Sequence, residues 1–145
     1  MITTIPQVTV LVPNEPGAIC RVTETLAAQN VDMRALSIAD TRDYGILRLI
    51  VRDTDKAIGA LSAIGLMAQV TPVIGVKISD EPGKLNKALQ VLREKKVNLE
   101  YLYAFLSRTE KHAYIILRVA DNDTAGEALL GAGFSLVSPD DIRRV

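Results

Sequence analysis

Asn14-Glu15-Pro16-Gly17 returns 66 residues later in the chain as Asp80-Glu81-Pro82-Gly83. The same shift aligns the segments that follow, Val31-Asp32-Met33 with Val97-Asn98-Leu99. Later matches need shifts of 68 to 70 residues, which indicates small insertions or deletions in the turns. Self-similarity at one period is the signature of a duplicated structural unit. The sequence therefore predicts two copies of one module.

Each copy has the same order of predicted elements. Apolar runs indicate strands and apolar residues at helical spacing indicate helices. Copy one has predicted strands at residues 8–12, 33–39, 44–51 and 67–71, with helices that begin at Pro16 and Asp53. Copy two has predicted strands at 76–79, 99–107, 113–120 and 135–137, helices at 83–95 and 124–132, and a helical turn capped by Ser138.

The order βαββαβ, present twice, predicts an α+β fold of two ferredoxin-like units packed side by side. We place the two units at residues 1–72 and 73–145. Only Thr71 to Val73 joins them, and this joint lacks the composition of a flexible linker. The strand Leu99 to Leu106 is apolar on both faces, so we expect its open face to be covered by the other unit or by a second chain.

Composition excludes several classes of protein. The 145 residues include 17 basic and 17 acidic side chains, so no net charge attracts nucleic acid or an anionic membrane. Cys20 is the one cysteine, and the N-terminus lacks the features of a signal peptide, so we expect a cytoplasmic protein. No segment approaches 18 continuous apolar residues, which is the length that a transmembrane helix needs.

A strand followed by Asn-Glu-Pro-Gly, an amphipathic helix and Asn30-Val31-Asp32-Met33 resembles the ACT domain. Copy two, with Asp80-Glu81-Pro82-Gly83 and Val97-Asn98-Leu99, resembles it too, so the resemblance covers nearly the whole chain. It implies a regulatory protein that binds a small ligand, usually an amino acid, at the interface between two such units. We expect a homodimer that acts through a metabolic enzyme or regulator, with no cofactor.

The turns into the first helix of each copy have the chemistry that a free amino acid needs. Its carboxylate is bound by unpaired N–H groups, which a helix start offers, and glycine lets a ligand approach the backbone. The alternative is that Pro-Gly only starts the helix. The predicted ligand contacts are Asn14, Glu15, Gly17, Ala18 and Ile19 in copy one and Asp80, Gly83, Lys84 and Leu85 in copy two.

Two further predicted contacts come from the resemblance to serine-sensing ACT pairs. These have one amide on this loop and another at the start of the neighbouring unit's second strand, which here are the positions of Asp32 and Asn98. Crossing the interface would pair Asn14 with Asn98, which suits a zwitterion, and Asp80 with Asp32, which suits only an ammonium group. We therefore expect two unequal sites.

Several other residues allow a functional and a structural interpretation. Arg48 and Arg118 in apolar strands could hold a carboxylate, but a salt bridge is the simpler reading. Tyr101, Tyr103 and Phe105 form an aromatic row that indicates packing rather than a pocket wall. Cys20 is interpreted as a small buried thiol, His112 as a turn residue, and Asp53 and Asp121 as helix caps.

Three classes of function were compared on these residues. An enzyme is disfavoured because no nucleophile–base set, metal-ligand spacing or phosphate-binding loop is present. An amino-acid sensor is favoured, and a structural or dimerisation module that has lost its ligand is the alternative. Val12 and Ile78 stand where the family has a histidine, which argues against a polar ligand such as serine.

Overall fold

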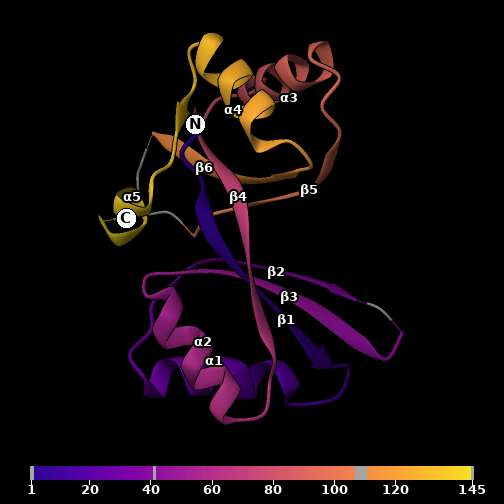
Figure 1. Cartoon of the computed structure of the whole chain (residues 1–145), viewed down its shortest axis with the longest axis vertical. Helices are drawn as coiled ribbons and strands as arrows, with labels where there is room; N and C mark the ends of the chain where they lie inside the picture. The colour runs from indigo at the N-terminus through magenta and orange to yellow at the C-terminus, as the bar shows by residue number, and fades with distance from the viewer. Residues whose placement is uncertain (1, 41, 107–110, 145) are drawn as a thin grey trace. The chain divides into compact units, whose positions relative to one another are not determined.

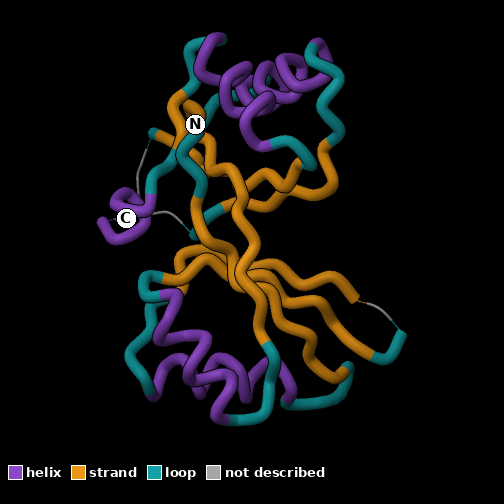
Figure 2. Tube along the Cα trace, in the orientation of Figure 1, coloured by secondary structure: helices purple, strands orange, loops and turns teal. Residues whose placement is uncertain are grey.

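A computed structural model of the chain describes residues 2–40, 42–106 and 111–144. The elements, labelled in Figure 1, are β1 (Ile5–Pro13), α1 (Ala18–Ala28), β2 (Met33–Asp40), β3 (Tyr44–Val51), α2 (Thr54–Ala63), β4 (Ala68–Ser79), α3 (Lys84–Glu94), β5 (Leu99–Ala104), β6 (His112–Val119), α4 (Asn122–Gly131), β7 (Ser135–Leu136) and α5 (Pro139–Arg144). The predicted α+β fold with two βαββαβ units is confirmed, and Figure 2 shows the same alternation of strands and helices.

The joint between the two copies differs from the prediction. Residues 67–71 and 76–79 were expected to form separate strands, but β4 runs without interruption from Ala68 to Ser79. The residues around Pro72 are mostly β-branched, and the ring of proline fixes a φ that an extended chain accepts. β4 is therefore both the last strand of the first βαββαβ unit and the first strand of the second.

Two compact units are present. The N-terminal unit comprises Pro6–Thr71, and the C-terminal unit comprises Pro72–Val145 together with Met1–Ile5. The predicted domains, 1–72 and 73–145, assign the first five residues to the other unit. Ile2 explains the position of these residues, because its backbone N–H donates to Asp123 Oδ1 at 3.3 Å.

In the N-terminal unit, β3 lies between β1 and β2 and is antiparallel to both. Figure 1 shows α1 and α2 on one side of these strands. Alternate side chains of the strands pack with residues of the two helices in one core. The fully buried residues of this core share an aliphatic character: Val8, Val10, Leu26, Leu47, Leu49 and Leu61.

The C-terminal unit repeats this arrangement with β6 between β4 and β5. β7 adds a short pairing to β4 through Val76 and Leu136. α3 and α4 cover one face, and the core includes Ile74, Val76, Leu117 and Leu129. The strand predicted at 99–107 ends at Ala104, and Ser107 lies outside the described residues, as does Thr41 of the predicted turn after β2.

The aromatic row lies within the C-terminal unit. The rings of Tyr101 and Tyr103 stack with centroids 6.4 Å apart, and Phe105 meets Tyr114 edge to face at 5.6 Å. Tyr103 and Phe105 are buried. The row is therefore packed, as the structural interpretation held.

Candidate functional site

The loop before α1 is fixed by its own backbone. The N–H of Asn14 donates to the carbonyl of Asp43 at 2.9 Å, and that of Ala18 donates to Glu15 at 3.3 Å. Gly17 has a φ of 83°, a left-handed conformation that side chains disfavour, and α1 begins directly after it. The predicted contacts Asn14, Glu15 and Ile19 are exposed on this loop and the first helical turn.

The starts of the four long helices fall into two classes. α2 and α4 are capped by aspartates: Asp53 accepts from the N–H of Lys56, and Asp121 accepts from that of Thr124. α1 and α3 begin after Gly17 and Gly83 and have no side-chain cap. The first N–H groups of a helix have no partner within it. The two uncapped helices therefore offer donors at the loops predicted to bind a ligand.

A pocket of about 190 Å³ adjoins the loop before α1. Its lining belongs to the N-terminal unit and consists of Val12, Pro13, Glu15, Pro16, Gly17, Ala18, Arg21 and Leu66. The predicted contacts Glu15, Gly17 and Ala18 therefore lie together. Asn14 and Ile19 are near in sequence but do not line this pocket.

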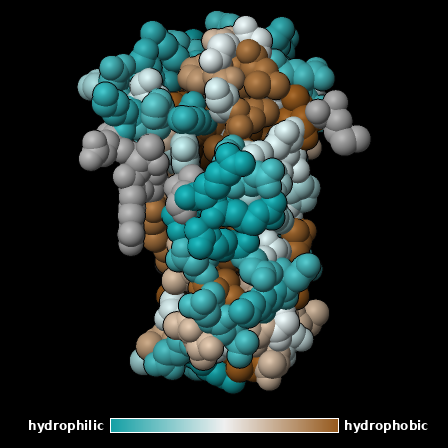
Figure 3. Space-filling view, turned by 90° about the vertical axis from the view of Figure 1, so that its left-hand side faces the viewer, coloured by the Kyte–Doolittle hydropathy of each residue, from teal (hydrophilic) through white to brown (hydrophobic). Residues whose placement is uncertain are grey.

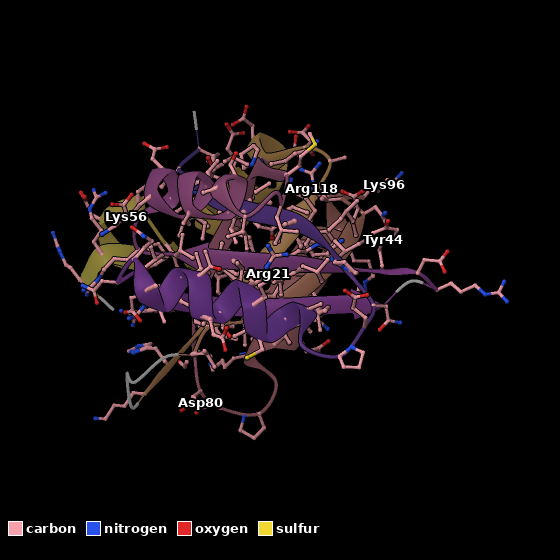
Figure 4. All side chains as sticks on the ribbon, turned by 90° about the horizontal axis from the view of Figure 1, so that it is seen from below. Arg21, Tyr44, Lys56, Asp80, Lys96 and Arg118 are labelled. Carbon is pink, nitrogen blue, oxygen red and sulfur yellow. The ribbon has the colours of Figure 1, made fainter. Side chains whose placement is uncertain are left out.

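Sequence analysis missed Arg21, the one cation of this lining. Its guanidinium donates to the carbonyl of Ile64, the C-cap residue of α2, at 3.0 Å; Arg21 is labelled in Figure 4. A signal was available, because Arg21 lies four residues after Gly17 and so on the same side of the helix. Leu66 was missed because only the fold brings the end of α2 to this loop.

The loop before α3 repeats the frame with different side chains. The N–H of Asp80 donates to the carbonyl of Lys111 at 3.0 Å, and Gly83 has a φ of 87°. Lys84 Nζ lies 3.8 Å from Glu81 Oε2, an ion pair that copy one cannot form because Ala18 holds the position of Lys84. Leu85 is half-buried against the core of its unit.

The two residues predicted at the start of the second strands have different surroundings. Asp32 forms an ion pair with Arg34 in its own unit, so its charge is already compensated. Asn98 lines a second pocket, of about 460 Å³, between the end of α3 and the start of β5. The other residues of this lining are Leu89, Leu92, Arg93, Lys96, Val97 and Leu99.

Three single-residue interpretations have clear outcomes. Arg118 forms a salt bridge with Glu100, Nε to Oε2 at 3.4 Å, as predicted. His112 is not in a turn but begins β6, opposite Ser79. Cys20 was expected to be buried and is exposed, because α1 buries Val22 and Leu26 instead.

The thiol of Cys20 is not activated by its place near a helix start. It donates a hydrogen bond to Glu24, with Sγ 3.3 Å from Oε1. This hydrogen bond and the negative charge of Glu24 raise the pKa of Cys20 above 9.0. Less thiolate is therefore present at neutral pH than in a free cysteine, which argues against a nucleophilic role.

The described residues contain neither a metal-binding cluster nor a membrane-spanning helix. No three His, Cys, Asp or Glu side chains in residues 2–40, 42–106 and 111–144 are grouped so that they could hold a metal ion. None of the helices in those same ranges is long and apolar enough to cross a membrane.

Comparison with known proteins gives the family. A family model described as an ACT domain pair matches residues 3–145. The crystal structure of protein BT0572 from Bacteroides thetaiotaomicron is similar, with a TM-score of 0.91 and 33% identity over 99% of both chains. No curated protein sequence matches this chain.

Aspartate kinases are among the other similar structures. The regulatory subunit of aspartate kinase from Thermus thermophilus has a TM-score of 0.65 and 19% identity, over 91% of this chain and 94% of that one. Aspartate kinase from Synechocystis has a TM-score of 0.57 and 25% identity, over 95% of this chain and 28% of that one.

Proposed function

Because the chain belongs to the family of ACT domain pairs, we propose that it is a non-catalytic regulatory protein that binds an amino acid. The ligand sites are the loops before α1 and α3. The protein acts through a partner, which is a metabolic enzyme or regulator, and it functions as a homodimer without a cofactor.

The observation that carries this proposal is the contrast between capped and uncapped helices. A carboxylate at the start of α1 would accept hydrogen bonds from N–H groups of the first helical turn, which no side chain caps, and would benefit from the positive end of the helix dipole. Arg21 in the adjoining pocket adds a cation, and the exposed carboxylate of Glu15 is an acceptor for the ammonium group. Leu66 and Val12 supply an apolar wall for the side chain of the ligand.

The similarity to aspartate kinases supports the regulatory part of the proposal. The Synechocystis kinase is a longer chain of which this protein matches about a quarter, and the Thermus thermophilus match is a regulatory subunit. A domain pair of this kind beside an enzyme is the arrangement that the proposed partner would require.

Thermal denaturation in the presence of each of the twenty amino acids tests the binding. A ligand at 100 times its dissociation constant should stabilise the protein by about 2.7 kcal/mol, which is a shift that is easily measured. The Arg21→Ala variant should lose most of the shift, and Lys56→Ala, a cation on α2 outside the pocket (both residues are labelled in Figure 4), should keep it. An unchanged shift in Arg21→Ala would contradict the assignment of the pocket.

The proposed pairing of amides needs its own test. Asn14 and Asn98 are proposed to hold one ligand between them, while Asp80 and Asp32 form the weaker site. The ion pair of Asp32 with Arg34 supports this inequality, since it leaves Asp32 less available to an ammonium group. Calorimetry should then give unequal sites, and Asn98→Ala should remove the tighter one. Two equal sites, or full binding by Asn98→Ala, would refute the pairing.

The alternative is a structural module that has lost its ligand. Hydrophobic side chains that stay exposed on the strands favour it, among them Leu36 and Leu102. Figure 3 shows that hydrophobic residues reach the surface beside hydrophilic ones. A stable dimer that shows no thermal shift with any amino acid would establish this alternative.

A further inference from the structure

The two copies provide an internal comparison of different side chains on the same backbone. The C-cap residues of α1 and α3 are each followed by a residue of left-handed conformation, Asn30 with a φ of 56° and Lys96 with a φ of 57°. The next strand starts three residues later in each copy, at Met33 and Leu99. Differences in side-chain chemistry at this connection therefore cannot be attributed to a change of fold.

Among the side chains that differ between the copies at this connection, four that lie together in the C-terminal unit change in polarity or charge. One polar residue has become apolar, two neutral residues have become cations, and one acid has become an amide. In order along the chain, Leu89 stands in place of Thr23, Arg93 in place of Ala27, Lys96 in place of Asn30, and Asn98 in place of Asp32.

These four residues line one pocket, which we call the α3–β5 pocket. Its volume of about 460 Å³ lies in the range of small-molecule sites. Leu92, Val97 and Leu99 complete an apolar wall, and the lining contains two cations and no acidic residue. The pocket belongs entirely to the C-terminal unit, and the loops before α1 and α3 do not contribute to it.

We propose that the α3–β5 pocket binds a small carboxylate that has an aliphatic body and no ammonium group. Arg93 matches a carboxylate with its planar guanidinium, and Lys96 adds a second positive charge. The leucines and valine contact the hydrocarbon body of the ligand. Among the side chains of the lining, only the amide oxygen of Asn98 could accept from an ammonium group, and no carboxylate neutralises its charge. The site therefore selects a 2-oxo acid over the amino acid with the same side chain.

The left-handed backbone conformation of Lys96 is a second observation that supports a functional role for this side chain. A lysine in the left-handed region costs about 1 kcal/mol relative to helical backbone, and asparagine tolerates this region better. Copy one has asparagine at the same place. A lysine there is costly for folding, and the proposed site supplies the reason for it.

Binding of 4-methyl-2-oxopentanoate and of leucine to the full-length chain tests the proposal, because the two share a carbon skeleton. Calorimetry should show the oxo acid binding at least about tenfold more tightly, which corresponds to 1.4 kcal/mol. Arg93→Ala and Lys96→Asn each restore the residue of copy one, and each should weaken binding of the oxo acid by about tenfold. Lys56→Ala, a cation of α2, serves as the control and should leave it unchanged.

Lys96→Asn is expected to stabilise the fold, so weaker binding by this variant would not result from unfolding. The experiment also separates this site from the amino-acid site. All of these variants keep Asn98. Arg21→Ala should leave the binding of the oxo acid unchanged. The Arg93→Ala, Lys96→Asn double variant should keep any thermal shift that an amino acid gives. Equal affinity for leucine and the oxo acid, no binding of the oxo acid, or unchanged binding in the double variant would overturn the proposal.

Discussion

At the scale of single residues, the duplication separates what the fold needs from what a copy has added. Among the described residues other than glycine, only Asn30 and Lys96 have a positive φ. Each directly follows the C-cap of a helix, where a left-handed residue lets the chain turn into the next strand. Asparagine is suited to this place and lysine is not, because its side chain makes no local hydrogen bond that favours the left-handed region.

Exchange of the two residues between the copies should therefore have opposite effects on stability. We expect Lys96→Asn to raise the free energy of unfolding by about 0.5 to 1 kcal/mol, and Asn30→Lys to lower it by a similar amount. Chemical denaturation measures both. Lys96→Ala is the control, since alanine has the same backbone penalty as lysine. A gain from alanine as large as that from asparagine would show that the lysine side chain, and not its backbone, is unfavourable.

At the scale of helices and strands, most of the fold could be predicted because local signals agreed with one another. β3 was placed at its true bounds from a run of apolar residues, and Asp53 and Asp121 were recognised as caps. β4 was predicted as two strands with Pro72 between them, and proline ordinarily interrupts a strand. Pro72 is exposed and lies where the chain passes between units, so its missing N–H costs little.

The cap of α4 makes stability depend on pH. Asp121 accepts hydrogen bonds from Thr124 Oγ1 at 2.6 Å and from its N–H at 3.0 Å, and these bonds lower the pKa of Asp121 below 3.8. A lowered pKa in the folded state gives stability that is present above the ordinary value and is lost as the pH falls through the folded value.

Asp121→Ala should therefore be less stable than the natural protein at neutral pH, and the difference should disappear in strong acid. Thermal denaturation from about pH 7 to about pH 2 measures it. Asp53→Ala is the matched variant, because Asp53 has a bond from the N–H of Lys56 and position 56 has no hydroxyl. It should cost about 1 kcal/mol at neutral pH. A pH-independent difference for Asp121→Ala would contradict the assigned cap.

At the scale of the whole molecule, the sequence identified the loops proposed to bind a ligand. It did not identify the residues from other elements that line the same pocket. Glu15, Gly17 and Ala18 were found because the motif repeats, whereas Leu66 enters the same pocket from the end of another helix. The contact between Ile2 and α4 is likewise not encoded in a local pattern. No local pattern states that Ile2 contacts Gly126, because 124 residues separate them.

The packing of Ile2 on α4 can be tested by mutation, because it joins residues that are far apart in the sequence. A Cβ on Gly126 would come within 2.8 Å of Ile2 Cγ1, so Gly126→Ala must displace the N-terminal residues. The crowding should cost about 1 to 3 kcal/mol, more than the roughly 1 kcal/mol that alanine gains in a helix. In the Ile2→Ala background the crowding is relieved, and the same change should stabilise. Denaturation of the four proteins measures the coupling, and an equal effect in both backgrounds would contradict the contact.

β2 and β5 are the edge strands, and both carry an exposed leucine. Within the described residues β2 pairs only with β3, and β5 pairs only with β6. Leu36 on β2 and Leu102 on β5 occupy equivalent positions of the repeat and are 37% and 38% exposed. Unpaired strand edges with exposed leucines are surfaces that proteins ordinarily cover.

We expect a second copy of the chain to cover these leucines, so the protein should sediment as a dimer. Leu36→Lys and Leu102→Lys should each weaken the dimer by more than about tenfold, because burial of one leucine contributes about 1.5 to 3 kcal/mol and a buried lysine would be unpaired. Leu130→Lys is the control, since Leu130 is 48% exposed but lies on α4 rather than on a strand edge. A monomer at every concentration would contradict the prediction. Thermal stability unchanged by the lysines would show that the change is confined to association.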